Sequence, residues 1–98
     1  MATATVTNSK TLTLTASVVD SITLTGRFMA VEIVHHGNVA NPIFAIASTA
    51  ATAPTAGGDN CEVVLPGERI RIPGAGANQT VVSLISAGAA TYTVIGVA

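Results

Sequence analysis

The sequence predicts an all-β protein, a single antiparallel β-sandwich or jelly-roll-like domain of about eight short strands. Apolar and polar residues alternate with a period of two in most segments, which is typical of half-buried strands. Glycine, proline and asparagine recur between these segments and indicate turns. Helical spacing of apolar residues together with capping residues is found nowhere in the chain.

The N-terminal part divides into an arm and a first long strand. Residues 1–10 alternate small apolar residues with threonine, and we expect an edge strand or a loose arm that tethers a neighbouring subunit. Residues 11–98 form the sandwich domain. Within it, residues 11–18 place leucine, alanine and valine on one face and threonine and serine on the other. We predict a strand there, with a bend at Ala16–Ser17 or at Asp20.

Two further strands are expected at residues 21–25 and 28–35. The second of them carries apolar residues on both faces, which favours a central position in its sheet. Glu32 is expected on one face, and the other face should hold the large apolar residues Met29, Val31 and Ile33.

Two apolar runs, residues 43–47 and 61–65, flank a loop of small residues at 48–60. In the second run Cys61 alternates with Val63 and Leu65, so we expect this face to be buried and the cysteine to act as a small core residue. A single cysteine cannot form an internal disulfide. The loop has no catalytic side chain, and we expect it at a subunit contact or on the exposed end of the sandwich.

Three strands are expected in the C-terminal part. Residues 68–72 alternate, with Ile70 and Ile72 predicted inward and the two arginines outward. Residues 81–85 and 91–97 are apolar and flank a short Ala-Gly-Ala turn, which predicts a hairpin.

Charged residues are scarce. They make up 9% of the chain, against about 25% in typical domains, while the mean hydropathy is +0.61 and the formal net charge is −1. Threonine hydroxyls can solvate the outer faces of strands. A surface that is packed against other subunits needs no charged residues to solvate it. Obligate interfaces resemble a domain core cut in half, so we expect both effects here.

The composition argues against nucleic-acid and membrane partners. The four cations are scattered and aromatic residues make up 3%, whereas nucleic-acid binding needs a clustered positive surface or stacking rings. Residues 72–98 lack charge, but proline, glycine and hydroxyl residues divide them into runs too short for a spanning helix. The N-terminus has no cationic start followed by an apolar stretch, so we expect no signal peptide and synthesis in the cytoplasm.

Two places resemble chemical sites, and we expect neither to be one. His35 and His36 are adjacent on a strand and point to opposite faces, whereas a zinc site needs three or four converging ligands. A calcium corner at 57–60 would offer too few oxygens, since Ca²⁺ takes six to eight. The sequence therefore predicts no catalytic residue, metal or cofactor, and no enzyme. Residues expected at interfaces are Thr55, Gly57, Gly58, Asp59, Asn60, Arg69, Arg71, His35 and His36.

Three segments, residues 11–28, 53–67 and 80–96, together resemble a group of small β-sandwich virion proteins of tailed bacteriophages, particularly those of actinobacteria. The more specific pieces are APTAGGDN followed by a Val-Leu-Pro strand, and LISAG before the last strand. The resemblance implies a decoration protein on the surface of the phage head, with the major capsid protein and copies of itself, commonly as a homotrimer, as partners. It implies no catalytic residue. His35, His36 and Cys61 are not features of that group.

Two alternatives to a head decoration protein stay open. One is a minor tail or fibre-associated component. The other is a carbohydrate- or receptor-binding module, although such modules place aromatic rings against sugars and this chain has no tryptophan and one tyrosine.

Overall fold

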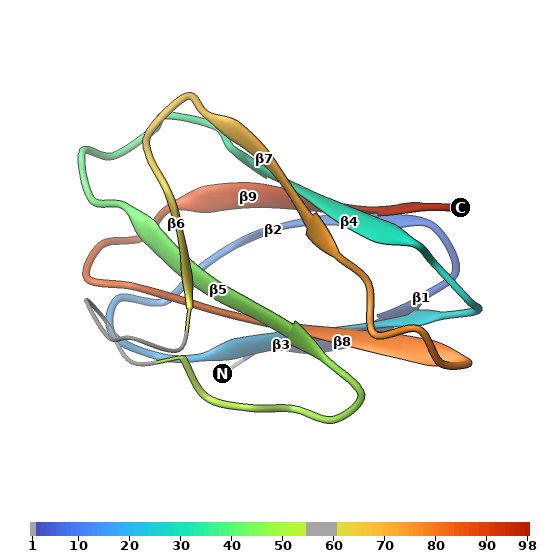
Figure 1. Cartoon of the computed structure of the whole chain (residues 1–98). Helices are drawn as coiled ribbons and strands as arrows, with labels where there is room; N and C mark the ends of the chain where they lie inside the picture. Colours follow the sequence, from blue (N-terminus) through green and yellow to red (C-terminus); the bar gives the residue numbers. More distant parts are fainter. Residues whose placement is uncertain (1, 55–60) are drawn as a thin grey trace.

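The computed structural model describes residues 2–54 and 61–98, and this part of the chain is all-β (Figure 1). It contains no helix that could cross a bilayer. Two sheets pack face to face as a sandwich. The strands are β1 (Thr3–Val6), β2 (Ser9–Thr13), β3 (Asp20–Thr25), β4 (Ala30–His35), β5 (Ile43–Ser48), β6 (Glu62–Val64), β7 (Arg69–Pro73), β8 (Gln79–Ser86) and β9 (Thr91–Val97).

Strands that follow one another in the sequence often lie in different sheets. Sheet A has the order β1-β3-β8-β5-β6, and sheet B has the order β2-β9-β4-β7. All strand pairs are antiparallel except β1 with β3, which run parallel. The central position expected for β4 is confirmed, since β9 and β7 flank it.

The predicted hairpin between β8 and β9 is wrong, because these strands lie in different sheets. β8 is buried over most of its length and sits between β3 and β5. The inward side chains of β9, such as Tyr92 and Val94, are buried in the same core from the opposite sheet. Two apolar strands joined by a short turn can stack across a core as well as pair edge to edge, and the turn does not distinguish the two arrangements.

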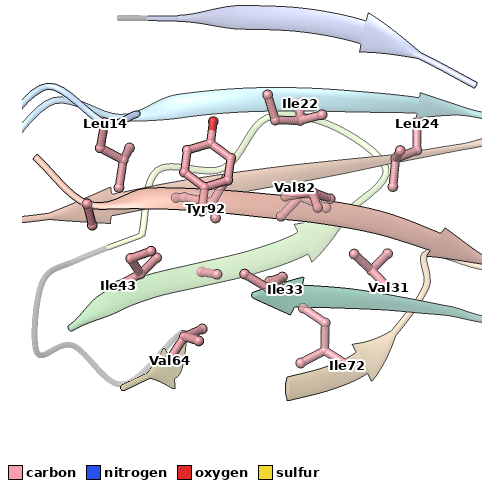
Figure 2. Packing of buried hydrophobic residues seen from close by; sticks show 14 residues of the cluster. Leu14, Ile22, Leu24, Val31, Ile33, Ile43, Val64, Ile72, Val82 and Tyr92 are labelled. Carbon is pink, nitrogen blue, oxygen red and sulfur yellow. The ribbon is translucent and has the colours of Figure 1, made fainter. Parts of the chain in front are cut away.

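One cluster of buried side chains fills the space between the sheets (Figure 2). Alternate residues of each strand contribute to it, as the period of two requires. The members are Leu14, Ile22, Leu24, Val31, Ile33, Ile43, Ala45, Val64, Ile72, Val82, Leu84, Ala90, Tyr92 and Val94.

The strand expected at 11–18 ends early. β2 stops at Thr13, and the amide of Leu14 donates to the carbonyl of Ala90 at 2.9 Å as the chain leaves the sheet. The bend predicted at Ala16–Ser17 is confirmed, because Ser17 has a positive φ of 61°. Asp20, the other candidate for the bend, instead begins β3 and is buried.

The face predicted for β6 is also wrong. Val64 is fully buried, while Val63 and Leu65 are 44% and 53% exposed and Cys61 is half-buried. β6 pairs with β5 in the register Ile43↔Val64, and Ile43 faces the core, so Val64 must do so too. Because Val63 and Val64 are adjacent, an alternating pattern can place either valine in the core.

On β4, Val31 and Ile33 face the core as expected, and Glu32 lies on the other face. Met29 does not share their face. It precedes β4 and is 80% exposed. The inward positions of Ile70 and Ile72 and the outward positions of the two arginines on β7 are confirmed.

Candidate interaction surfaces

His35 is a core residue, which corrects its expected place at a surface or interface. Its side chain is 1% exposed. Nδ1 accepts a hydrogen bond from the amide of Gly37 at 2.9 Å, and Nε2 donates to the carbonyl of Asn41 at 2.8 Å. An amide only donates and a carbonyl only accepts, so these partners fix the tautomer with the proton on Nε2. Both ring nitrogens are therefore engaged in holding the loop after β4, and neither is available to a metal or substrate.

His36 points the opposite way, as expected for its neighbour on a strand. It is exposed, and its Nε2 lies 2.7 Å from the hydroxyl of Thr93. That hydroxyl in turn lies 2.7 Å from the hydroxyl of Thr11, and Thr13 pairs with Thr91 at 2.8 Å. These threonines cover the outer face of sheet B with hydroxyls that satisfy one another.

Arg69 and Arg71 lie on the same outer face, either side of one carboxylate. Both form ion pairs with Glu32, the Arg69 pair at 3.3 Å, and their side chains remain 63% and 62% exposed. The hydrogen bond from Arg71 is the main cause that holds the pKa of Glu32 below its ordinary value. Exposed pairs of this kind contribute little to stability. The structure thus brings Arg69 and Arg71 together through Glu32, and it places His36 beside Thr93 on the same outer face.

Sheet A carries an apolar patch on its outer face, formed by Phe44, Val63, Leu65 and Ile85. Phe44 is the cross-strand partner of both Val63 and Ile85, so these side chains form a row over three adjacent strands. Val63 and Leu65 are the most exposed side chains of this patch. The sequence gives no sign of this patch, because the alternation of Cys61, Val63 and Leu65 predicts that this face of β6 is buried.

A buried polar pair joins the two sheets. The Tyr92 hydroxyl of β9 donates to Oδ2 of Asp20 on β3 at 2.8 Å, and the amide of Ala2 donates to Oδ1 at 3.0 Å. Asp20 is 1% exposed and Tyr92 fully buried. Burial, and then the hydrogen bond to the Asp20 carboxylate, raises the pKa of Tyr92 well above its ordinary value. No sequence signal could link these residues, because they lie 72 positions apart.

Two open grooves lie beside the strands. One, of about 410 Å³, runs between β5 and the end of β7, and Ala45, Glu62 and Ile72 are among the residues that line it. The other, of about 490 Å³, lies on the outer face of sheet A between β1 and β3 and residues 50–51. Among the described residues, no three His, Cys, Asp or Glu side chains lie close enough to hold a metal ion.

Thr55, Gly57, Gly58, Asp59 and Asn60 of the expected interface lie outside the described residues. Their role therefore stays a prediction. Comparison with known proteins finds no matching family model, no matching curated protein and no matching solved structure.

Proposed function

We propose that this chain is a structural protein of a bacteriophage virion, a decoration protein that binds the capsid lattice of the head and stabilises it. In this proposal its partners are the major capsid protein and further copies of itself, arranged as a homotrimer. It acts by contact alone, on the outside of the head, without nucleic acid, membrane or cofactor.

The observation that carries the proposal is the character of the surface. Large apolar side chains, those of Met29, Val63 and Leu65, are exposed on a chain in which charged residues make up only 9%. Exposed apolar patches on soluble domains mark contact sites, and homo-oligomer interfaces are more apolar than the rest of the surface. The apolar patch on sheet A therefore suits a contact with protein.

The side chains that could do chemistry have structural partners instead. His35 uses both ring nitrogens within its own loop, and the Asp20 carboxylate is buried against Tyr92 and Ala2. These contacts favour a binding role over catalysis. The resemblance of residues 53–67 and 80–96 to small virion proteins supports the phage head as the place of binding.

The test is co-sedimentation of the purified protein with shells assembled from the major capsid protein of the same phage. We expect saturable binding and a higher temperature of shell disruption. Binding to purified tails and not to heads would assign the chain to the tail. A soluble monomer that binds neither would overturn the proposal.

Variants of the apolar patch sharpen the test. We expect Val63→Thr combined with Leu65→Ser to weaken shell binding or self-association more than tenfold, because both side chains are exposed and apolar. Light scattering and co-sedimentation measure the two effects. Thr13→Ser, on the outer face of sheet B, is the matched control and should change neither.

A further inference from the structure

The first strand, β1, is held in sheet A mainly through its backbone. It runs parallel to β3, in the register Thr3↔Ser21 to Val6↔Leu24. Side chains at both ends of β3 bind backbone atoms of the β1 segment: Asp20 Oδ1 accepts from the amide of Ala2 at 3.0 Å, and Thr25 Oγ1 donates to the carbonyl of Val6 at 3.2 Å. Such contacts do not depend on which copy of the chain supplies the strand.

The edge of β3 is built to receive a strand. With β1 in place Asp20 is 1% exposed, Oδ2 is bonded to Tyr92 and Oδ1 is bonded to the amide of Ala2, so removal of the β1 segment takes away the donor to Oδ1. Ala4 and Val6 of β1 pack against the core beside Ile22 and Leu24. The site therefore fits a strand with small apolar residues at alternate positions.

The other three sheet edges are protected against added strands. β6 has only three residues, β7 carries two arginines and Pro73, and β2 carries Lys10. Short edges, charges and proline are the usual means of blocking strand addition. β1, with the sequence TATV, is also short, but it carries neither charge nor proline, and it is the outermost strand of sheet A in Figure 2, beyond β3.

The connection from β1 to β2 is short. Only Thr7 and Asn8 join the two strands, which belong to different sheets (Figure 1). Asn8 is fixed to sheet B because its carbonyl accepts from the amide of Gly96 at 2.8 Å, so β1 can swing out about Thr7 alone. Short hinge loops favour exchange of the element they carry.

We propose that β1 is exchanged between copies of this chain, so that β1 of one copy occupies the β3 edge, and bonds to Asp20, of the next. This inference rests on the proposed function, because neighbouring copies must be concentrated on a lattice. A short tether gives the chain's own β1 an effective concentration of order mM, which neighbours on a lattice can match. The absence of charge before Lys10 removes repulsion between arms.

The test uses two single-cysteine variants in a Cys61→Ser background. Thr5→Cys on β1 and Thr23→Cys on β3 replace cross-strand partners. The two proteins, carrying tags of different size, are refolded together at about 1 mM, a concentration that matches the effective concentration of a tethered strand, and treated with a short thiol–thiol cross-linker. We expect covalent heterodimers to exceed half of the cross-linked product, with little product from either variant alone.

The control pair is Thr11→Cys with Thr93→Cys, whose hydroxyls are 2.7 Å apart in the native chain. Because β2 is not exchanged in this scheme, the mixture should give no heterodimer. Heterodimers from both pairs would mean that a larger segment moves, and would overturn the inference. The inference would also be overturned if a doubly substituted Thr5→Cys/Thr23→Cys chain cross-linked only within itself while the mixture gave no heterodimer.

Shell co-sedimentation of the same samples separates this inference from the proposed function. Shell binding without heterodimers leaves the decoration role standing and rejects exchange. Heterodimers without shell binding support exchange and reject the decoration role.

Discussion

Tyr92 and Asp20 show how one side chain organises a core of this size. Tyr92 is the largest fully buried side chain, and its ring packs among aliphatic residues contributed by both sheets (Figure 2). Its hydroxyl finds a partner in Asp20 across the sandwich. A buried carboxylate is tolerated only when its oxygens are hydrogen-bonded, so this tyrosine, with the amide of Ala2, permits an acid inside the domain.

Tyr92→Phe is therefore expected to destabilise the protein by about 1.5–3 kcal/mol, the usual contribution of a hydrogen bond to a charged group. Urea unfolding followed by circular dichroism measures it. Thr13→Val, which removes one exposed hydroxyl from the outer face of sheet B, is the matched control and should cost less than about 0.5 kcal/mol. Equal losses of unfolding free energy in the two variants would show that the buried hydrogen bond stabilises the protein no more than an exposed one does.

The same substitution should change how stability depends on pH. Since the pKa of Tyr92 is raised in the folded state, the folded phenol stays neutral where the unfolded one ionises. Its contribution is complete below the unfolded pKa of about 10 and is lost as the pH rises above it. The difference in unfolding free energy between the native protein and Tyr92→Phe should therefore shrink between pH 9 and 11, values that bracket that pKa of about 10. A constant difference would contradict the assignment.

At the scale of elements, the packing at the end of the sandwich between β3 and β4 requires a glycine, Gly96. The Phe28 ring lies over Gly96 of β9, and a Cβ there would stand 2.6 Å from the ring carbon Cε1. Phe28 packs against the core and cannot move outward without losing that contact. Glycine in a strand commonly marks such a close approach.

Gly96→Ala is expected to destabilise the protein by about 1–3 kcal/mol, the usual cost of overpacking. The reason is steric, so the cost should fall in a chain that also carries Phe28→Ala. A double-mutant cycle measured by thermal unfolding isolates this coupling. The same loss with and without the ring would show that the backbone, and not Phe28, requires the glycine.

The strand pattern predicted most elements, and the failures have local causes. Strict alternation placed β3, β4 and β7 and their core residues close to where they lie. The inward face of β6 was misjudged because Val63 and Val64 offer two equivalent registers, and only pairing with Ile43 decides between them. The burial of His35 depends on a loop that returns the carbonyl of Asn41 to its ring. A strand pattern carries no information about such a loop.

At the scale of the whole molecule, the central strands come late in the sequence. In sheet A, β8 pairs with both β3 and β5, and in sheet B, β9 pairs with both β2 and β4. Most contacts therefore join residues far apart in the chain. Folds dominated by such pairings fold in milliseconds to seconds, and their strands remain unpaired until distant segments meet.

A fragment of residues 1–78 is therefore expected to remain unfolded, since it lacks β8 and β9, each of which joins two other strands of its sheet. Circular dichroism should show no cooperative thermal transition for this fragment, whereas the whole chain should show one. A fragment of residues 7–98, which lacks β1 but keeps all of β2, serves as the control and should keep the transition at a lower temperature. A folded fragment of residues 1–78 would mean that the remaining strands can form a core by themselves.

The late position of β8 and β9 also fixes the order of events during synthesis. Residues 79–97 must leave the ribosome before either sheet can close, so the sandwich cannot form until β8 and β9 have been synthesised. Until then β3 and β5 have no β8 to pair with, and β2 and β4 have no β9, so the edges of these strands stay open to other chains.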